Sequence, residues 1–158
     1  MAPVMHMTNY DELNAQLQSL IEGVPHKIAN LANASALLWQ SLEDLNWAGF
    51  YLMTEGELVL GPFQGKPACI RIPLGRGVCG TAAASGETQL VPDVHAFPGH
   101  IACDCASNAE IVVPIRQEGR VVAVLDIDSP SLGRFTEEDR VGLEGFVRVL
   151  EGAWGSMR

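Results

Sequence analysis

The most constraining feature of this sequence is a pair of apolar stretches in its C-terminal half, separated by a short turn. Residues 111–115 and 121–127 are rich in β-branched side chains, and Gln117-Glu118-Gly119 lies between them. A three-residue loop that ends in glycine closes many β-hairpins, because glycine readily adopts the left-handed conformation required there. The two stretches therefore predict an antiparallel hairpin with at least one buried face.

This turn also predicts which residues lie opposite each other. It places Arg116 opposite Arg120 and, further along, Glu110 opposite Asp126, with Asp128 one step beyond on the same face. The opposite face is continuously apolar and consists of Ile111, Val113, Ile115, Val121, Ala123, Leu125 and Ile127. The face with the carboxylates carries four further apolar residues, Val112, Pro114, Val122 and Val124. Three carboxylates are thus expected to gather at one end of an apolar surface.

Like charges held this close cannot all ionise freely, so at least one of the three carboxyl pKa values should rise. A carboxyl group that keeps its proton near neutral pH can act as an acid catalyst. The alternative is that the three are solvated, or pair with Arg71, Arg76 or Arg116. The sequence alone leaves both readings open.

Other segments place helices around this hairpin. Helical spacing of apolar residues covers 11–22 and 25–42, a short helix is expected over 78–85, and Thr136 caps a final helix. Short strands are expected over 47–53, 58–60, 69–73 and 89–91, with an irregular stretch over 92–107. This order predicts one α+β domain over residues 1–158, with a central antiparallel sheet. The N- and C-terminal helices should cover the face of Ile111 and Leu125, leaving Val112 and Val124 toward a pocket.

The overall charge excludes some classes of partner. A net charge of −9 argues against nucleic acid or an anionic membrane as the main partner, because both repel an acidic surface. The first ten residues do not resemble a signal peptide, and no stretch is long enough to span a bilayer. We therefore expect a cytoplasmic protein whose thiols are kept reduced.

The four cysteines all lie in the middle of the chain, at Cys69, Cys79, Cys103 and Cys105. In a reducing compartment they serve core packing, metal binding or redox chemistry rather than a permanent disulfide framework. A single free cysteine is often only a small buried apolar residue, but four set among Gly, His and Asp favour chemistry. A metal site at His95, His100, Cys103 and Cys105 is the rival, although Cys-x-Cys is an uncommon zinc spacing.

An aromatic pair accompanies these groups. Trp47 and Tyr51 fall on the same face of their predicted strand, and Gly49 between them leaves a gap that two rings could wall. Ordinary core packing is the alternative for both rings.

Several motifs occur together in a fixed order. They are Gly75-Arg76-Gly77-Val78-Cys79-Gly80-Thr81-Ala82, His100-Ile101-Ala102-Cys103-Asp104, Ser107-Asn108-Ala109-Glu110 and Leu125-Asp126-Ile127-Asp128-Ser129. With Asn46-Trp47-Ala48-Gly49-Phe50-Tyr51 and Leu60-Gly61-Pro62-Phe63-Gln64-Gly65, they closely resemble the free methionine-(R)-sulfoxide reductases, a family of stand-alone GAF-domain enzymes. The resemblance implies a GAF-like fold and thiol-dependent reduction of free L-methionine-(R)-sulfoxide, recycled by thioredoxin, with no metal or organic cofactor.

The resemblance also implies a role for each site residue. Cys103 matches the nucleophile, Cys69 the resolving thiol and Cys79 an auxiliary thiol. Glu110, Asp126 and Asp128 match substrate-binding and acid positions, and Trp47 and Tyr51 match the aromatic pocket. Cys105 departs from the family pattern, where a small residue is expected. A Cys103–Cys105 disulfide would close a very small ring, so Cys105 is a secondary resolving option.

One alternative function and one expected form of assembly accompany this interpretation. A non-catalytic GAF module that senses a small ligand shares the fold, but it has no need of three spaced cysteines facing carboxylates. A homodimer is compatible with the resemblance, because GAF domains often pair.

Overall fold

The computed structural model describes residues 7–99 and 107–158. In chain order the elements are α1 (Tyr10–Ile21), α2 (Lys27–Ser41), β1 (Trp47–Thr54), β2 (Glu57–Gly65), β3 (Arg71–Ile72), α3 (Gly77–Ser85), β4 (Gln89–Val91), the 3-10 helix η1 (Val94–Ala96), β5 (Ala109–Gln117), β6 (Arg120–Ser129) and α4 (Glu137–Trp154). The predicted α+β class is confirmed. Within the described ranges, no helix is both long and apolar enough to cross a membrane.

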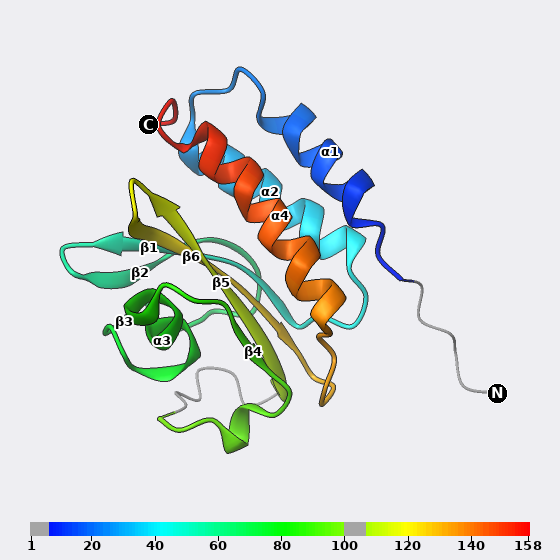
Figure 1. Ribbon diagram of the computed structural model, residues 1–158, viewed down its shortest axis with the longest axis vertical. Helices are drawn as coiled ribbons and strands as arrows, with labels where there is room; N and C mark the ends of the chain where they lie inside the picture. Colours follow the sequence, from blue (N-terminus) through cyan, green and yellow to red (C-terminus); the bar gives the residue numbers. More distant parts are fainter. Residues whose placement is uncertain (1–6, 100–106) are drawn as a thin grey trace.

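The strands form one antiparallel sheet in the order β3-β2-β1-β6-β5-β4, with helices on both faces (Figure 1). The helices α2 and α4 cover one face of the sheet, and α1 packs against these two helices. On the other face, α3 lies against β5 and β6. The helices near the two ends of the chain thus share one side, as predicted.

Two apolar clusters occupy the two sides of the sheet. The helix-side core contains Leu17, Leu38, Phe50, Ile111, Leu125 and Phe146, among others. The pocket-side cluster contains Trp47, Tyr51, Cys79, Val112 and Val124, among others. The predicted helix-side position of Ile111 and Leu125 and the pocket-side position of Val112 and Val124 are therefore confirmed.

The turn between β5 and β6 is shorter than predicted. Glu118 and Gly119 alone form it, with φ angles of 53° and 79°, so Gln117 rather than Arg116 pairs with Arg120. Two successive left-handed residues are typical of the type I′ turn, whose twist matches that of the flanking strands. A glutamate in this conformation is uncommon, which is why the sequence favoured a loop with only glycine left-handed.

β6 then departs from regular pairing immediately after the turn. Ile115 pairs with Ala123 while Arg116 pairs with Val121, so Val122 is an extra residue on β6, a β-bulge. Val121 packs against the pocket-side cluster and Val122 against the helix-side core. Both assignments are the reverse of the predicted ones, because a bulge breaks the alternation of side chains.

The carboxylates keep their predicted face although their predicted pairing is wrong. Glu110 pairs with Asp128, and Asp126 pairs with Val112 rather than with Glu110. The short turn and the bulge each shift the pairing by one residue, and the two shifts add to two. Side chains alternate with a period of two, so the three carboxylates still share the pocket side.

β2 continues five residues beyond the predicted end at Leu60 and includes Gly61 and Pro62. Proline is tolerated there because the pairing of β2 with β3 involves only Leu58 and Val59 among the described residues. No β3 residue lies opposite Pro62, so its missing N–H removes no hydrogen bond between these two strands. β3 is shorter than expected and comprises only Arg71 and Ile72. The stretch predicted to be irregular contains η1 and nothing else regular among its described residues.

The final helix begins as predicted. The Thr136 side chain accepts a hydrogen bond from the backbone N–H of Asp139, and the Asp139 carboxylate accepts one from the Thr136 N–H. This capping box satisfies two backbone donors that would otherwise have no partner at the helix start. α2 begins at Lys27, two residues after Pro25, with His26 as its N-cap.

Candidate active site

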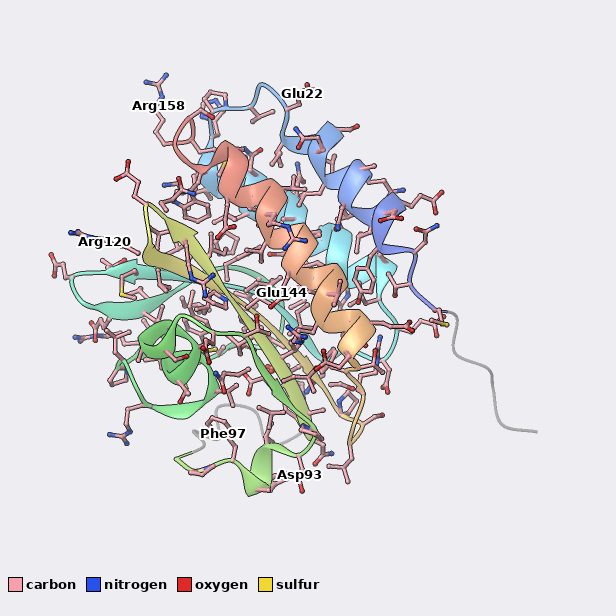
Figure 2. All side chains as sticks on the ribbon, in the orientation of Figure 1. Glu22, Asp93, Phe97, Arg120, Glu144 and Arg158 are labelled. Carbon is pink, nitrogen blue, oxygen red and sulfur yellow. The ribbon has the colours of Figure 1, made fainter. Side chains whose placement is uncertain are left out.

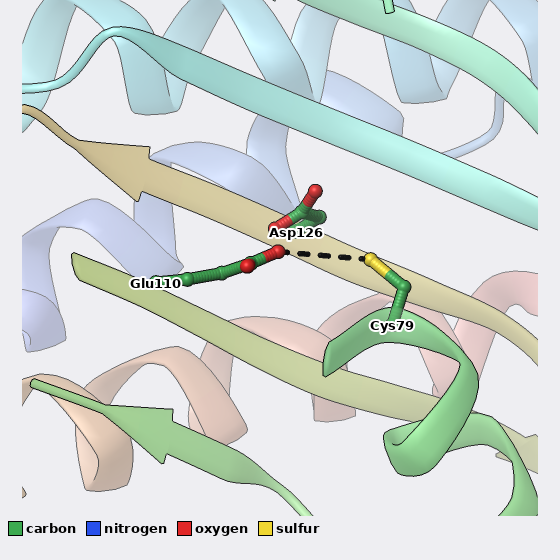
Figure 3. Close-up of side chains that lie close together, drawn as sticks. All are labelled: Cys79, Glu110 and Asp126. Carbon is green, nitrogen blue, oxygen red and sulfur yellow. Dashed lines mark hydrogen bonds between the residues drawn. The ribbon is translucent and has the colours of Figure 1, made fainter. Parts of the chain in front are cut away.

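Three elements bring a thiol and two carboxyl groups together on the pocket side of the sheet. Cys79 lies in the first turn of α3, Glu110 near the start of β5 and Asp126 near the end of β6 (Figure 3). The Cys79 thiol donates a hydrogen bond to Glu110 Oε2 at 3.9 Å, and one ligand atom of each residue lies within 4.8 Å of the others. All three side chains are buried, with exposed fractions of 4%, 8% and 5%.

Burial disfavours the charged form of every group in this cluster. It raises the pKa of Glu110 well above its usual range, and the neighbouring Asp126 raises it further. It likewise raises the pKa of Asp126, with Asp128 as the next cause. Ion pairing does not offset this, because no ion pair between described residues involves Glu110 or Asp126. The predicted rise of at least one carboxyl pKa is what the geometry produces.

Cys79 is not an activated thiol in this setting. A helix N-terminus tends to lower a cysteine pKa, but here burial raises the pKa of the Cys79 thiol, and Asp126 is the next cause. In this structure the Cys79 thiol is a hydrogen-bond donor to Glu110, in a setting that disfavours its thiolate form.

A wall of aromatic rings borders the cluster. The Trp47 ring stacks on Tyr51 with centroids 5.9 Å apart and on Phe63 with centroids 5.1 Å apart. Polar atoms fix both predicted rings, since Trp47 Nε1–H donates to the Lys66 carbonyl at 3.1 Å and the Tyr51 hydroxyl to the Cys69 carbonyl at 2.8 Å. These are the two rings that the sequence placed on one face.

Gly49 has a different role from the predicted one. A Cβ at Gly49 would lie 2.2 Å from the Cβ of Phe63, its partner on β2. The absent side chain thus makes room for a third ring rather than for a gap between two. Gly65 is equally constrained, because its φ is +131° and an added Cβ would lie 2.7 Å from the Trp47 ring.

These groups line one pocket. Its wall also includes Ala68, Ile72, Arg76, Val78, Ser107 and Asp128. The start of α3 faces it through Gly77, Val78 and Cys79, whose backbone N–H groups have no acceptor within the helix. The pocket therefore combines an acidic end, an aromatic wall and a helix N-terminus that favours an anion.

The cysteines separate into two kinds. Cys69 is disulfide-bonded, whereas Cys79 is a free buried thiol. The second cysteine of the Cys69 bond lies outside the described residues, as do the predicted positions Cys103, Cys105 and His100.

The end of the chain segment that carries Cys103 is anchored beside the pocket. The Asn46 side chain donates to Ser107 Oγ at 3.1 Å, and the backbone N–H of Asn108 donates to the Ser129 carbonyl. His95 belongs to η1, which Asp93 and Phe97 flank (Figure 2). Its Nε2 atom lies 3.1 Å from Asn108 Oδ1. His95 thus contacts the described end of this segment through Asn108.

Comparison with known proteins identifies the family. A GAF-domain family model matches residues 31–153. A protein of Escherichia coli named free methionine-R-sulfoxide reductase is 56% identical over 142 residues, which cover 90% of this chain and 86% of that protein. A Saccharomyces cerevisiae protein of the same name is 45% identical, with 90% and 86% covered. The chain belongs to the free methionine-R-sulfoxide reductase family.

A solved structure gives the same result at the level of the fold. The free methionine-R-sulfoxide reductase of Neisseria meningitidis, in complex with its substrate, superposes with a TM-score of 0.91 at 43% identity. The match covers 98% of this chain and 96% of that one. The GAF-like fold expected from the sequence is thereby confirmed.

In this reductase-family chain, the structure brings together six of the eight predicted site residues, Trp47, Tyr51, Cys79, Glu110, Asp126 and Asp128, at one pocket. Cys69 is tied to the same wall through the Tyr51 hydroxyl, and Cys103 lies outside the described residues. Phe63 was missed because its contact with Trp47 depends on the irregular pairing of β1 with β2. The sequence signals for it are a glycine on the neighbouring strand and its place in the motif Leu60-Gly61-Pro62-Phe63-Gln64-Gly65.

Proposed function

We propose that this chain reduces free methionine-(R)-sulfoxide to methionine, with Cys103 as the nucleophile and the buried carboxyl cluster as the source of the proton. The observation that carries the proposal is the burial of Glu110 and Asp126 beside an aromatic wall, which raises both carboxyl pKa values and so favours the protonated form that an acid catalyst needs. Sulfoxide oxygen leaves only when it is protonated, so the pocket supplies what the reaction needs.

The chemistry balances with two thiols and an external dithiol. Cys103 as thiolate attacks the sulfoxide sulfur while Glu110 or Asp128 protonates the oxygen, and methionine leaves with the oxygen retained on Cys103 as sulfenic acid. The Cys69 thiol displaces this oxygen as water and forms a disulfide. A reductant of the thioredoxin class then returns both cysteines to thiols and is itself oxidised, consistent with a cytoplasmic protein.

Chain length supports the assignment of Cys103. Cys103 precedes Ser107, which lines the pocket, by four positions, so the two lie within about 14 Å of each other even in a fully extended chain. Support for Cys69 as the resolving thiol is that it is disulfide-bonded and that its carbonyl accepts a hydrogen bond from Tyr51, which lines the pocket. We propose Cys103 as the partner of Cys69, which peptide mapping of the non-reduced protein would test.

The pocket also accounts for a free amino acid as substrate. Carboxylates at Asp126 and Asp128 can pair with an ammonium, and the backbone N–H groups at the start of α3 can receive a carboxylate. A methionine sulfoxide inside a peptide has neither charged group. The aromatic wall then receives the methyl-sulfinyl end.

The decisive experiment is a thioredoxin-coupled assay that follows NADPH oxidation with three substrates. Free L-methionine-(R)-sulfoxide should turn over, whereas its S epimer and a peptide-bound sulfoxide should not. Binding of the free sulfoxide without turnover would contradict the proposal and favour a GAF sensor module.

The two thiols should separate in a single-turnover experiment. Cys103→Ser should abolish methionine release, whereas Cys69→Ser should release one equivalent without reductant and then stop, because attack needs only the nucleophile. Quantifying methionine by chromatography tests both. Sustained turnover in Cys69→Ser would transfer the resolving role to Cys79 or Cys105.

A further inference from the structure

The reductase proposal uses Glu110 and Asp126 for protonation and substrate binding, but it does not use the set that they form with the Cys79 thiol, which has the composition of a metal site. We propose that these three side chains bind a divalent cation of the zinc class, and that this cation inhibits the enzyme by occupying the substrate's ammonium position. The inhibitory part rests on the proposed function, whereas the binding site rests on the cluster alone.

The distances are close to those of a coordination site. Cys79 Sγ and Glu110 Oε2 are 3.9 Å apart, and no pair of the three ligand atoms is separated by more than 4.8 Å. Zinc bonds of about 2.3 Å to sulfur and about 2.0–2.2 Å to oxygen place neighbouring ligand atoms about 3.5 Å apart in a tetrahedron. A contraction of up to about 1.3 Å in the longest separation, through small changes of side-chain rotamer, would complete the geometry.

A second observation points independently to a missing partner. Asp126 Oδ1 is buried and has no hydrogen-bond partner among the described residues, although Asp126 is only 5% exposed. An unsatisfied buried oxygen is costly, and a ligand in the pocket is the usual resolution. Asp126 lines the pocket beside Cys79 and Glu110, so a cation shared by all three would satisfy this atom.

The donor types select the class of cation. One thiolate with two carboxylates suits zinc and its chemical relatives, whereas calcium and magnesium prefer oxygen ligands alone. An ammonium group would gain nothing from the sulfur. The three ligands also come from three elements, α3, β5 and β6, and leave a fourth position toward the pocket, as in open zinc sites.

Binding must displace protons, because the thiol and carboxyl groups favour their neutral forms in this buried setting. Affinity should therefore increase as the pH rises. The other ionisable groups facing the site are Asp128 on β6, which attracts a cation, Tyr51 on β1, and Arg76 before α3, which repels it.

Cobalt(II) is the most informative probe, because thiolate ligation gives it a charge-transfer absorption that oxygen ligands do not. The full chain is titrated in its oxidised form, in which Cys69 is disulfide-bonded and cannot ligate. Zinc affinity is measured in parallel by competition with a chromophoric chelator. We expect one equivalent of each metal and release of protons on binding.

Variants assign the ligands. Loss of even an indirect partner of a metal site costs about 10–100-fold in affinity, so Cys79→Ser should weaken zinc binding by about 100-fold or more and remove the cobalt charge-transfer band. Asp126→Asn should weaken zinc binding by at least about tenfold. Circular dichroism confirms that each variant is folded before its affinity is compared.

Cys105→Ser is the matched control, since it removes a thiol outside the cluster and should leave both metals bound. An unchanged band in Cys79→Ser, or its loss in Cys105→Ser, would overturn the proposal, the latter in favour of the His95 loop. In the wild type, zinc should raise the apparent KM for the sulfoxide and a chelator should reverse this; an unchanged KM would overturn the inhibitory role. A protein that binds zinc but shows no reductase activity would refute the proposed function and leave the metal site standing.

Discussion

At the scale of single residues, Glu110 and Asp126 illustrate a conflict between chemistry and stability. Both carboxyl groups are buried, and burial raises both pKa values. The next cause is Asp126 for the pKa of Glu110 and Asp128 for the pKa of Asp126. Such groups bind protons more tightly in the folded than in the unfolded chain. Their contribution to stability is therefore present at low pH and is lost as the pH rises from about 4 toward the raised pKa.

Removing the charge should consequently stabilise the fold at neutral pH. Asp126→Asn should raise Tm at pH 7, by about 2–4 °C for each kcal/mol relieved in a chain of this size, and the gain should disappear near pH 4. Glu137→Gln is the control, because Glu137 is exposed, pairs with Arg140 and has its pKa lowered by that partner. Scanning calorimetry of both variants at the two pH values measures this, and a neutral-pH Tm below wild type for Asp126→Asn would contradict it.

The same residues should differ in catalysis. Glu110→Gln should lower mainly kcat, because donation to the sulfoxide oxygen strengthens in the transition state, and Asp126→Asn should raise mainly KM through the lost ammonium contact. Asp128→Asn should also lower activity, and the losses for Asp126 and Glu110 should be about 10²-fold or more. Glu118→Gln at the hairpin turn should leave both constants unchanged. Near wild-type kinetics in all three pocket variants would mean that the carboxyl cluster takes no part in the reaction.

At the scale of elements, the sequence predicted local order well and contacts between elements less well. Period-two alternation in β5 and β6 was enough to divide the hairpin between two faces, and Thr136 with Asp139 was enough to place the start of α4. The end of β2 was missed, because whether a strand tolerates Pro62 depends on which strand pairs beside it. The contact of Cys79 with Glu110 joins α3 to β5, and no local pattern encodes that distance.

Gly65 is the element-scale test of the aromatic wall. Gly65→Ala adds a Cβ where the Trp47 ring lies and strains a backbone with φ of +131°, so the ring should be displaced and kcat/KM should fall by about tenfold or more. Tryptophan fluorescence and steady-state kinetics report the two effects. Gly152→Ala in α4 is the matched control, because nothing lies within 4 Å of its added Cβ, and it should stabilise the helix by about 0.5–1 kcal/mol. Equal activity of the two variants would show that the ring position is unimportant.

At the scale of the whole molecule, β5 and β6 form a partition with a packed core on one side and the pocket on the other. Leu125 and Val124 are consecutive residues, yet one belongs to the helix-side core and the other to the pocket-side cluster. Stability and substrate binding are therefore carried by opposite faces of the same strands.

Truncating these two neighbours should separate the two properties. Leu125→Ala should cost about 2–5 kcal/mol of unfolding free energy, while KM stays unchanged below the new Tm. Val124→Ala should cost less stability and raise KM, because it loosens the packing of Trp47 and Tyr51. Urea denaturation and kinetics at one temperature compare them. A KM effect confined to Leu125→Ala would contradict the partition.

The β-bulge at Val122 also predicts which single residue of β6 can be deleted without loss of the strand pairing. Val121 and Ala123 already face opposite sides of the sheet, as adjacent residues of an uninterrupted strand would. Deleting Val122 should therefore leave every pair from Ile115–Ala123 to Glu110–Asp128 in place, whereas deleting Val124 would move both aspartates to the wrong side. A single-codon deletion scan read out by soluble expression and activity should tolerate the first loss and reject the second.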